Sequence, residues 1–342
     1  MGMVGAGEVC GMSARIAVVA ALVALASLVA ACGEKEEAER PGSAEDFDLV
    51  LDFYVNPDHA GIYEAIDRGD FREAGLEVHP QVPSDPSAPI RQVAAGRADL
   101  AISYEPEVLL ARDQRLPVTA VAALVPRPLT SLISLPDAGI DDAADLRDKT
   151  IATAGIPYQT AFLEAILAQA DLTPDDVDQV DVGFNLLPAI LSGRADAMLG
   201  GFLNVEGVDL RLRGREPRVV PVDDLGVPTY DELVLVANSD RVEDDPEAIR
   251  LFIAALESGT RAAADDPAGA TAAILDAGQG LEPRLTRAEI DETLPLLLPE
   301  KGNPFGYMDP GEWERFAGFM ADEGLTEERL TPDEVLTNDL LP

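Results

Sequence analysis

The sequence predicts an α/β protein of two lobes, each with a mainly parallel sheet, joined by a hinge of two chain segments. An internal repeat is the first reason. Gly-Arg-Ala-Asp begins at Gly96 and again at Gly193, 97 residues apart, and Glu64 and Glu164 of two similar helical segments are 100 residues apart. Two ordered matches at nearly equal spacing indicate two related units. The second reason is that β-rich segments alternate with helical patterns in both units.

Each unit begins with a strand that runs into a turn containing proline. These strands are expected at residues 47–55 and 148–155. The helices that follow carry apolar residues at helical spacing, as in Ile62, Ala65 and Ile66 of the first unit. A second strand and helix then end at Gly-Arg-Ala-Asp, where glycine stops the helix. Short buried strands follow at residues 100–103 and 197–200, and third strands at 117–125 and 218–225.

The C-terminal third is predicted to be helical. Thr286 and Glu289 match a capping box at the start of one of its helices. Because there is no third α/β unit, these helices are expected to pack on the first lobe. The chain would then cross between lobes near Leu132 to Pro136 and near Tyr230 to Val236. This assigns residues 47–133 and 232–342 to lobe 1, and residues 134–231 to lobe 2.

The N-terminus resembles an export signal. Sixteen apolar residues, Ile16 to Ala31, follow Arg15 and end on Cys32. A run of this length is typical of a signal peptide and is short for a membrane span. "VAAC" matches a bacterial lipoprotein signal, in which the cysteine receives the lipid; an ordinary secretory peptide is the alternative. We therefore expect a signal peptide over 1–31, lipidation of Cys32 and contact with the membrane through that lipid alone.

Composition restricts the class of the exported domain. The polar segment after Cys32 predicts a flexible tether over residues 32–46. The 342 residues are 47% hydrophobic with a net charge of −38, so the domain should fold while repelling nucleic acid. The only cysteines are Cys10 and Cys32, which leaves the domain without a disulfide or a thiolate metal site. We expect it to act as a monomer.

The ligand site of such a protein is expected beyond the carboxyl ends of the strands, beside helix N-termini. The residues selected by this rule and by the second crossing are Phe53, Tyr54, Asn56, His59, Tyr104, Glu105, Gly155, Pro157, Tyr158, Asn185, Phe202, Asn204, Glu206 and Tyr230. Aromatics, amides and carboxylates dominate, without Lys or Arg. Such a set suits a neutral or cationic, planar, nitrogen-rich molecule and suits a sulfonate or phosphate badly.

No enzyme signature accompanies these residues. The sequence lacks a phosphate-binding loop, a nucleophile elbow and a histidine pair at metal-ligand spacing, so no metal or cofactor is expected. His59 would then serve as a cap or turn residue. Glu206 is the strongest candidate for a residue that binds the ligand, because it is the lone acid within "GGFLNVEGV", a stretch of small and apolar residues.

The chain resembles the substrate-binding lipoproteins of ABC importers, in the branch that binds thiamine-pyrimidine precursors. The resemblance covers Asp48 to Leu325 and rests on long strings such as "SYEPE" and "VGFNLLPAILSGRADAMLGGFLNVEG". It implies a type II periplasmic-binding-protein fold that clamps an aminopyrimidine between aromatic side chains. Phe53 occupies the position of a tryptophan in relatives, which keeps the stacking face and loses the indole N–H.

The same resemblance implies the partners and the activity. The protein would capture a hydroxymethylpyrimidine or formylaminopyrimidine outside the cell and deliver it to a permease with a cytoplasmic ATPase. Related eukaryotic pyrimidine synthases use a lysine and a histidine, and these fall at Tyr104 and Glu107 here, so no enzyme activity is expected. The alternatives are a riboflavin or sulfonate binder, or an exported enzyme with Glu105 or Glu206 as its base.

Overall fold

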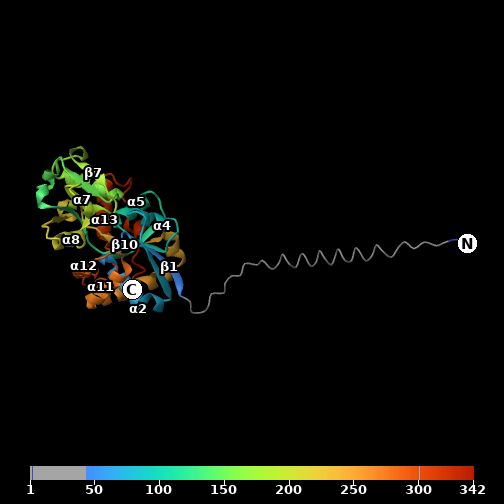
Figure 1. Ribbon diagram of the computed structural model, residues 1–342. Helices are drawn as coiled ribbons and strands as arrows, with labels where there is room; N and C mark the ends of the chain where they lie inside the picture. Colours follow the sequence, from blue (N-terminus) through green and yellow to red (C-terminus); the bar gives the residue numbers. More distant parts are fainter. Residues whose placement is uncertain (1, 3–43, 300) are drawn as a thin grey trace. The chain divides into compact units, whose positions relative to one another are not determined.

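Two five-stranded sheets organise the chain (Figure 1). The computed structural model describes residues 2, 44–299 and 301–342, so the predicted signal peptide, Cys32 and most of the tether lie outside the described residues. The first sheet has the order β2-β1-β3-β10-β4, from Leu76–Gln81, Glu45–Val50, Leu100–Ser103, Leu233–Asn238 and Val118–Val125. The second has the order β7-β6-β8-β5-β9, from Asp178–Asp181, Thr150–Thr153, Ala197–Phe202, Thr130–Ser134 and Arg218–Pro221. The predicted two-lobed α/β class is confirmed.

Three details of the prediction are wrong. Strand β1 begins at Glu45, inside the predicted tether, and ends at Val50, well before residue 55. Strand β5 pairs with β8 and β9, so residues 130–133 belong to the second sheet and not to lobe 1. The sheets are mixed, because β10 runs antiparallel to β3 and β4, and β5 runs antiparallel to β8 and β9. These two strands follow the crossings between sheets, which return the chain in the opposite direction.

The Gly-Arg-Ala-Asp repeat has the same structural role in both sheets. Its glycine adopts a left-handed conformation, with φ of 64° in the first copy and 71° in the second, and this turn ends the preceding helical segment. Its aspartate then accepts a hydrogen bond from a neighbouring strand. Asp99 Oδ2 accepts from Asp48 N at 2.6 Å, and Asp196 Oδ2 accepts from Thr150 N at 2.8 Å. The repeat therefore joins the start of a central strand to the strand beside it.

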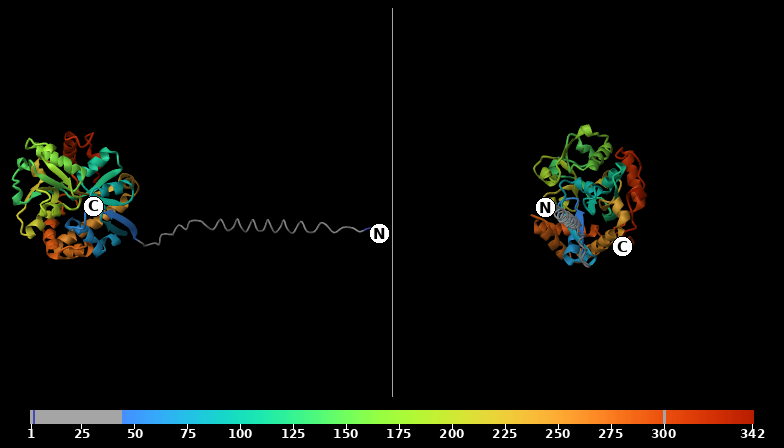
Figure 2. Two further views of the ribbon diagram at one scale, coloured as in Figure 1. Left: turned by 45° about the horizontal axis from the view of Figure 1, so that its top comes forward. Right: turned by 90° about the vertical axis from the view of Figure 1, so that its right-hand side faces the viewer.

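Helices flank both sheets. Those before β10 are α2 (Ala60–Arg68), α3 (Asp70–Glu73), α4 (Ala88–Ala94), α5 (Glu105–Asp113), α6 (Pro157–Ala168), α7 (Leu186–Leu191) and α8 (Glu206–Leu212). Those after it are α9 (Ser239–Asp244), α10 (Pro246–Asp265), α11 (Pro267–Ala277), α12 (Pro283–Thr293), α13 (Pro310–Asp322) and α14 (Pro332–Val335). Helices α10 and α11 pack on α2, beside the first sheet, as the orange and blue ribbons show (Figure 1). The red C-terminal segment, with α13 and α14, packs on α5 (Figure 2).

Both crossings between the sheets meet at Glu232, which is fully buried. On the first crossing, Leu129 N and Thr130 N each donate to Glu232 Oε2 at 2.7 Å, and Thr130 Oγ1 donates to Oε1 at 2.9 Å. On the second, Tyr230 Oη donates to Oε2 at 3.0 Å. One carboxyl group thus holds the two hinge segments together. Within the described residues, no helix combines the length and apolar character needed to cross a membrane.

Candidate functional site

A cavity of about 200 Å³ lies where loops of both lobes meet. Its lining comes from the loop after β1, from Tyr104, from the loops around α6, α7 and β8, and from α12. The lining residues are Asp52, Phe53, Tyr54, Val55, Asn56, Pro57, Tyr104, Ala154, Ile156, Tyr158, Gln159, Leu186, Gly200, Phe202, Val205, Glu206, Leu281, Glu282, Leu285, Thr286 and Glu289. The strand-end rule therefore led to loops that line this cavity.

Half of the residues predicted for the site line this cavity. They are Phe53, Tyr54, Asn56, Tyr104, Tyr158, Phe202 and Glu206. The set keeps the chemistry expected from the sequence, with five aromatic rings, one amide and one carboxylate, drawn from the two lobes. Contact with a ligand stays a prediction for each of them.

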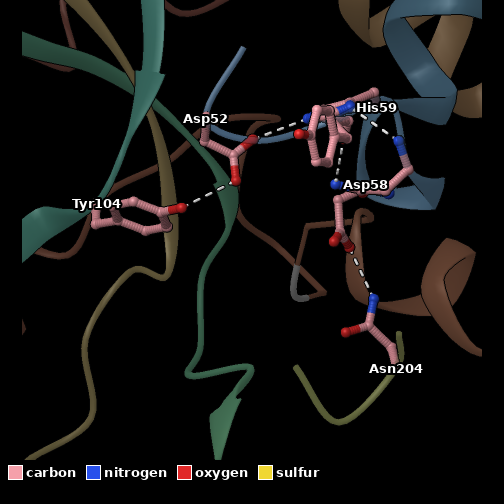
Figure 3. A network of polar contacts seen from close by, with 7 residues as sticks. Asp52, Asp58, His59, Tyr104 and Asn204 are labelled. Carbon is pink, nitrogen blue, oxygen red and sulfur yellow. Dashed lines mark hydrogen bonds and ion pairs between the residues drawn. The ribbon is translucent and has the colours of Figure 1, made fainter. Parts of the chain in front are cut away.

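His59 does not line the cavity. It contacts Asp52, which does (Figure 3). Its Nδ1 accepts from Asn56 N at 3.3 Å, so the proton of a neutral imidazole is on Nε2, which lies 2.8 Å from Asp52 Oδ1. Tyr104 Oη donates to Asp52 Oδ2 at 3.0 Å. Both carboxyl oxygens of Asp52 therefore accept a hydrogen bond. This buried network explains why β1 ends early: Asp52 turns away from the sheet and shapes the loop that forms the cavity wall.

Asn204 also lies outside the cavity, where it joins the two lobes (Figure 3). Its Nδ2 donates to Asp58 Oδ1 and to Thr293 Oγ1, each at 2.8 Å. Asp58 follows β1, whereas Asn204 follows β8 of the second sheet. Burial raises the pKa of Asp58 to about 8, against the hydrogen bond from Asn204, which lowers it. The amide therefore holds the lobes together below the site.

The other predicted residues that miss the cavity have clear structural reasons. Glu105 is fully buried and its Oε2 accepts from Asp231 N at 2.7 Å, on the side of the hinge. Tyr230 is buried because its hydroxyl binds Glu232. Gly155 and Pro157 are exposed at the start of α6, where the intervening Ile156 points inward instead.

Asn185 is the last of these. It is exposed at the N-cap of α7, and the next residue, Leu186, reaches the cavity in its place. Asn185, Gly155 and Pro157 are thus each one position away in the sequence from a residue that lines the cavity. A residue count along a loop does not reveal which side chains point inward, because loops lack the fixed periodicity of strands and helices.

Aromatic rings from the two lobes meet beside the cavity. Phe184, in the loop between β7 and α7, has its ring centroid 4.5 Å from that of Phe53 and 4.4 Å from that of Tyr54. Tyr104 and Tyr158 also face each other across the lobes, with centroids 5.7 Å apart. Each of these pairs is in direct contact, edge to face or tilted, so the rings join the two lobes beside the cavity.

Gln159, on the predicted loop that leads into α6, also lines the cavity. Its Oε1 accepts from Ala154 N at 2.8 Å, which orients the amide, and its Nε2 has no hydrogen bond to another described residue. Gly200 makes room for this amide, since a Cβ there would lie 2.2 Å from Nε2. The same glycine has a φ of 111°, which disfavours any other residue. Gln159 therefore offers a hydrogen-bond donor to a ring nitrogen.

Helix α12 forms a further wall of the cavity, which the sequence did not predict. Its N-cap is Glu282, whose carboxylate accepts from Arg284 N and Leu285 N, and the predicted capping box at Thr286 and Glu289 is wrong. Pro283 after Glu282 suits the first helical position and starts the helix four residues earlier than predicted. As a result, Thr286 and Glu289 lie within the helix, where both are buried and line the cavity.

The charged side chains in the lining are all acidic. Asp52, Glu206, Glu282 and Glu289 line the cavity, and no Lys, Arg or His is among the lining residues that the structure describes. Glu206 Oε2 accepts from Phe202 N at 2.7 Å, and burial raises its pKa. No group of three or more metal-ligating side chains occurs among the described residues. The site can thus attract a cation or pair with amine donors, and it offers no counter-charge to an anion.

Comparison with known proteins agrees with this arrangement. The family described as NMT1/THI5 like matches residues 56–270. The chain belongs to the NMT1/THI5-like family. One NMT1/THI5-like relative is the formylaminopyrimidine-binding protein of Halalkalibacterium halodurans, 33% identical over 317 residues that cover 92% of this chain and 96% of that protein. Another is 4-amino-5-hydroxymethyl-2-methylpyrimidine phosphate synthase of Aspergillus parasiticus, 28% identical over 245 residues, or 68% of this chain and 71% of the synthase.

Solved structures show the fold of this NMT1/THI5-like chain. The alkanesulfonate-binding protein SsuA of Xanthomonas axonopodis pv. citri matches with a TM-score of 0.68 and 15% identity, over 86% of this chain and 99% of that one. The periplasmic sulfonate-binding protein SsuA of Escherichia coli matches with a TM-score of 0.65 and 15% identity, over 85% and 97%. The predicted periplasmic-binding-protein fold is confirmed.

Proposed function

We propose that this protein is the substrate-binding component of an ABC importer that captures a small aminopyrimidine, of the hydroxymethylpyrimidine or formylaminopyrimidine type. The ligand is held between the lobes and released, unchanged, to a permease coupled to a cytoplasmic ATPase. The formylaminopyrimidine-binding relative, similar along nearly its whole length, supports this assignment.

The chemistry of the cavity is the observation that carries the proposal. Phe53 and Phe202, from opposite lobes, offer ring faces. Gln159 has an amide donor free for a ring nitrogen, and Glu206 can accept from an exocyclic amine. A cavity of about 200 Å³ is smaller than the roughly 300 to 1,000 Å³ of drug-sized ligand sites, which favours a single substituted ring.

The same observations disfavour the alternatives. An isoalloxazine has three fused rings and a long side chain, which is large for this cavity. A sulfonate would meet four acidic residues of the described lining and no basic one. An enzyme is disfavoured because Glu105, one of its two possible bases, lies outside the cavity. The family resemblance also places Tyr104 and Glu107 where the synthases have their lysine and histidine.

Calorimetry tests the function directly. The mature domain should bind hydroxymethylpyrimidine or its formylamino analogue with one site per chain, and more tightly than riboflavin or an alkanesulfonate. Chromatography after incubation should recover the pyrimidine unchanged. Tighter binding of riboflavin or of the sulfonate, or conversion of the pyrimidine, would reject the proposal.

Cys32 is the proposed site of the lipid that keeps the protein on the outer face of the cell membrane. Because a lipidated cysteine is the only membrane attachment in this proposal, replacing Cys32 with serine should move the protein from the membrane fraction or block its maturation. Replacing Cys10, which precedes the apolar run, should change neither. Intact mass of the native protein should include the lipid; an unmodified Cys32 would contradict the assignment.

A further inference from the structure

Glu289 is the one acidic residue of the described lining without a hydrogen-bond donor. It lies on α12, is 6% exposed, and has no hydrogen bond to any residue that the structure describes. The other three acids are satisfied differently: Asp52 accepts from His59 and Tyr104, Glu282 caps α12, and Glu206 accepts from Phe202 N. Its carboxyl oxygens are not among the fully buried atoms without a partner, so they face the open cavity. A carboxyl group placed there without a protein donor can accept from a donor on the ligand.

The surroundings of Glu289 are negative. From α8 of the second lobe come Glu206 and Asp209, and from the turn after β1 comes Asp58. Burial and these three acids raise the pKa of Glu289 to about 8. The side chains with a compensating charge on α12 point elsewhere: Arg287 pairs with Asp291, and Arg284 is exposed.

The remaining elements packed on α12 add no positive charge near Glu289. Helix α11 carries one titratable residue, Asp276, which is exposed, and the turn Leu294–Leu296 carries none. Two other elements packed on α12 carry a group that can be positive: Arg211 of α8 is exposed, and His59 in the turn after β1 lies 2.8 Å from Asp52. The charged side chains that act on Glu289 are therefore acidic. A cation placed between Glu289 and Glu206 would reduce the repulsion between the two carboxylates and would interact with one carboxylate of each lobe.

We propose that Glu289 and Glu206 form a two-carboxylate clamp for a substituent of the pyrimidine ring, so that an ammonium group in place of the hydroxyl of hydroxymethylpyrimidine strengthens binding. This inference rests on the proposed function and extends it to the charge of the ligand. The positive group is an ammonium on a ring substituent, which can donate to a carboxylate of each lobe.

Two matched ligands test the clamp. Hydroxymethylpyrimidine and its aminomethyl analogue share the ring and differ in an –OH or an –NH₃⁺ group. At pH 7 and low salt, the wild-type domain should bind the aminomethyl compound at least about tenfold more tightly, as expected for a charged hydrogen bond in a buried site. Glu289→Gln keeps the shape and removes the charge, so it should bring the two affinities within about twofold of each other.

A control variant and a second measurement separate charge from structure. Glu292→Gln changes an exposed residue of the same helix and should keep the wild-type preference. Calorimetry in buffers of different ionisation enthalpy should show proton release when the wild type binds the aminomethyl compound, because the ammonium lowers the pKa of Glu289. Glu289→Gln should lose that release.

The outcomes are distinguishable. If the wild type binds both pyrimidines equally, or if Glu289→Gln keeps the preference, the clamp is rejected while the pyrimidine-binding function stands. If the wild type binds neither of these pyrimidines nor the formylamino analogue, both proposals are rejected.

Discussion

Replacing Glu232 with alanine is expected to lower the free energy of unfolding by about 4 kcal/mol. The change leaves two backbone N–H groups and two hydroxyl groups of the hinge without their shared acceptor. Each buried donor left unsatisfied costs about 1 to 3 kcal/mol. Urea unfolding, followed by circular dichroism, measures the loss.

A matched control and a conservative variant make this test specific. Glu216→Ala removes an exposed glutamate of the second lobe and should change stability by less than about 0.5 kcal/mol. Glu232→Gln can keep the contacts, because its oxygen replaces Oε2 and its amide can donate to the Thr130 hydroxyl. Equal stability of Glu232→Ala and wild type would show that the carboxyl group does not hold the hinge.

Glu232 also predicts how stability depends on pH. Burial raises its pKa from 4.5 to about 7. Between these values the folded protein binds more protons than the unfolded chain, so its stability falls as the pH rises through this window. Asp58, Glu107, Asp231 and Glu289 act in the same direction. The melting temperature should therefore decrease from pH 5 to pH 8, and less steeply in Glu232→Gln.

Replacing Glu206 with alanine is expected to weaken pyrimidine binding by roughly ten- to a hundredfold, the value of one hydrogen bond to a charged group. Its carboxylate is held in the cavity wall by Phe202 N at 2.7 Å, so it meets the ligand in a fixed orientation. Glu206→Gln keeps the shape and one acceptor and should bind with intermediate affinity. Calorimetry with hydroxymethylpyrimidine measures the affinity of the three proteins, which should decrease from wild type to Glu206→Gln to Glu206→Ala.

Two further variants test whether the loss is local to the site. Phe53→Ala should also weaken binding, because it removes a stacking face. Glu216→Gln, in the loop after α8 and away from the cavity, should bind like the wild type. Equal affinity of wild type, Glu206→Gln and Glu206→Ala would remove Glu206 from the site.

Local sequence was enough to locate one side of the site. The repeated Gly-Arg-Ala-Asp indicated two units, and the ends of their strands indicated the loops that carry Phe53, Tyr104 and Phe202. These inferences succeed because strands and helices have fixed periods, and because turns need particular residues. The family resemblance rests on the same local strings.

The tertiary structure alone decided which side chains of these loops face the cavity and what closes its other side. His59 and Asn204 look like ligand residues in the sequence. In the structure His59 binds Asp52 and Asn56 of its own loop, whereas Asn204 binds Asp58 and Thr293, which are far away along the chain. Glu289 shows the opposite error, because the sequence predicted a structural role and the structure places it in the cavity wall. Its spacing from Thr286 matched a helix cap, whereas the helix begins earlier, at Pro283. Helical periodicity identifies a buried face, but the partner of that face is set by long-range packing. For α12 that partner is a site built mostly from residues more than seventy positions away.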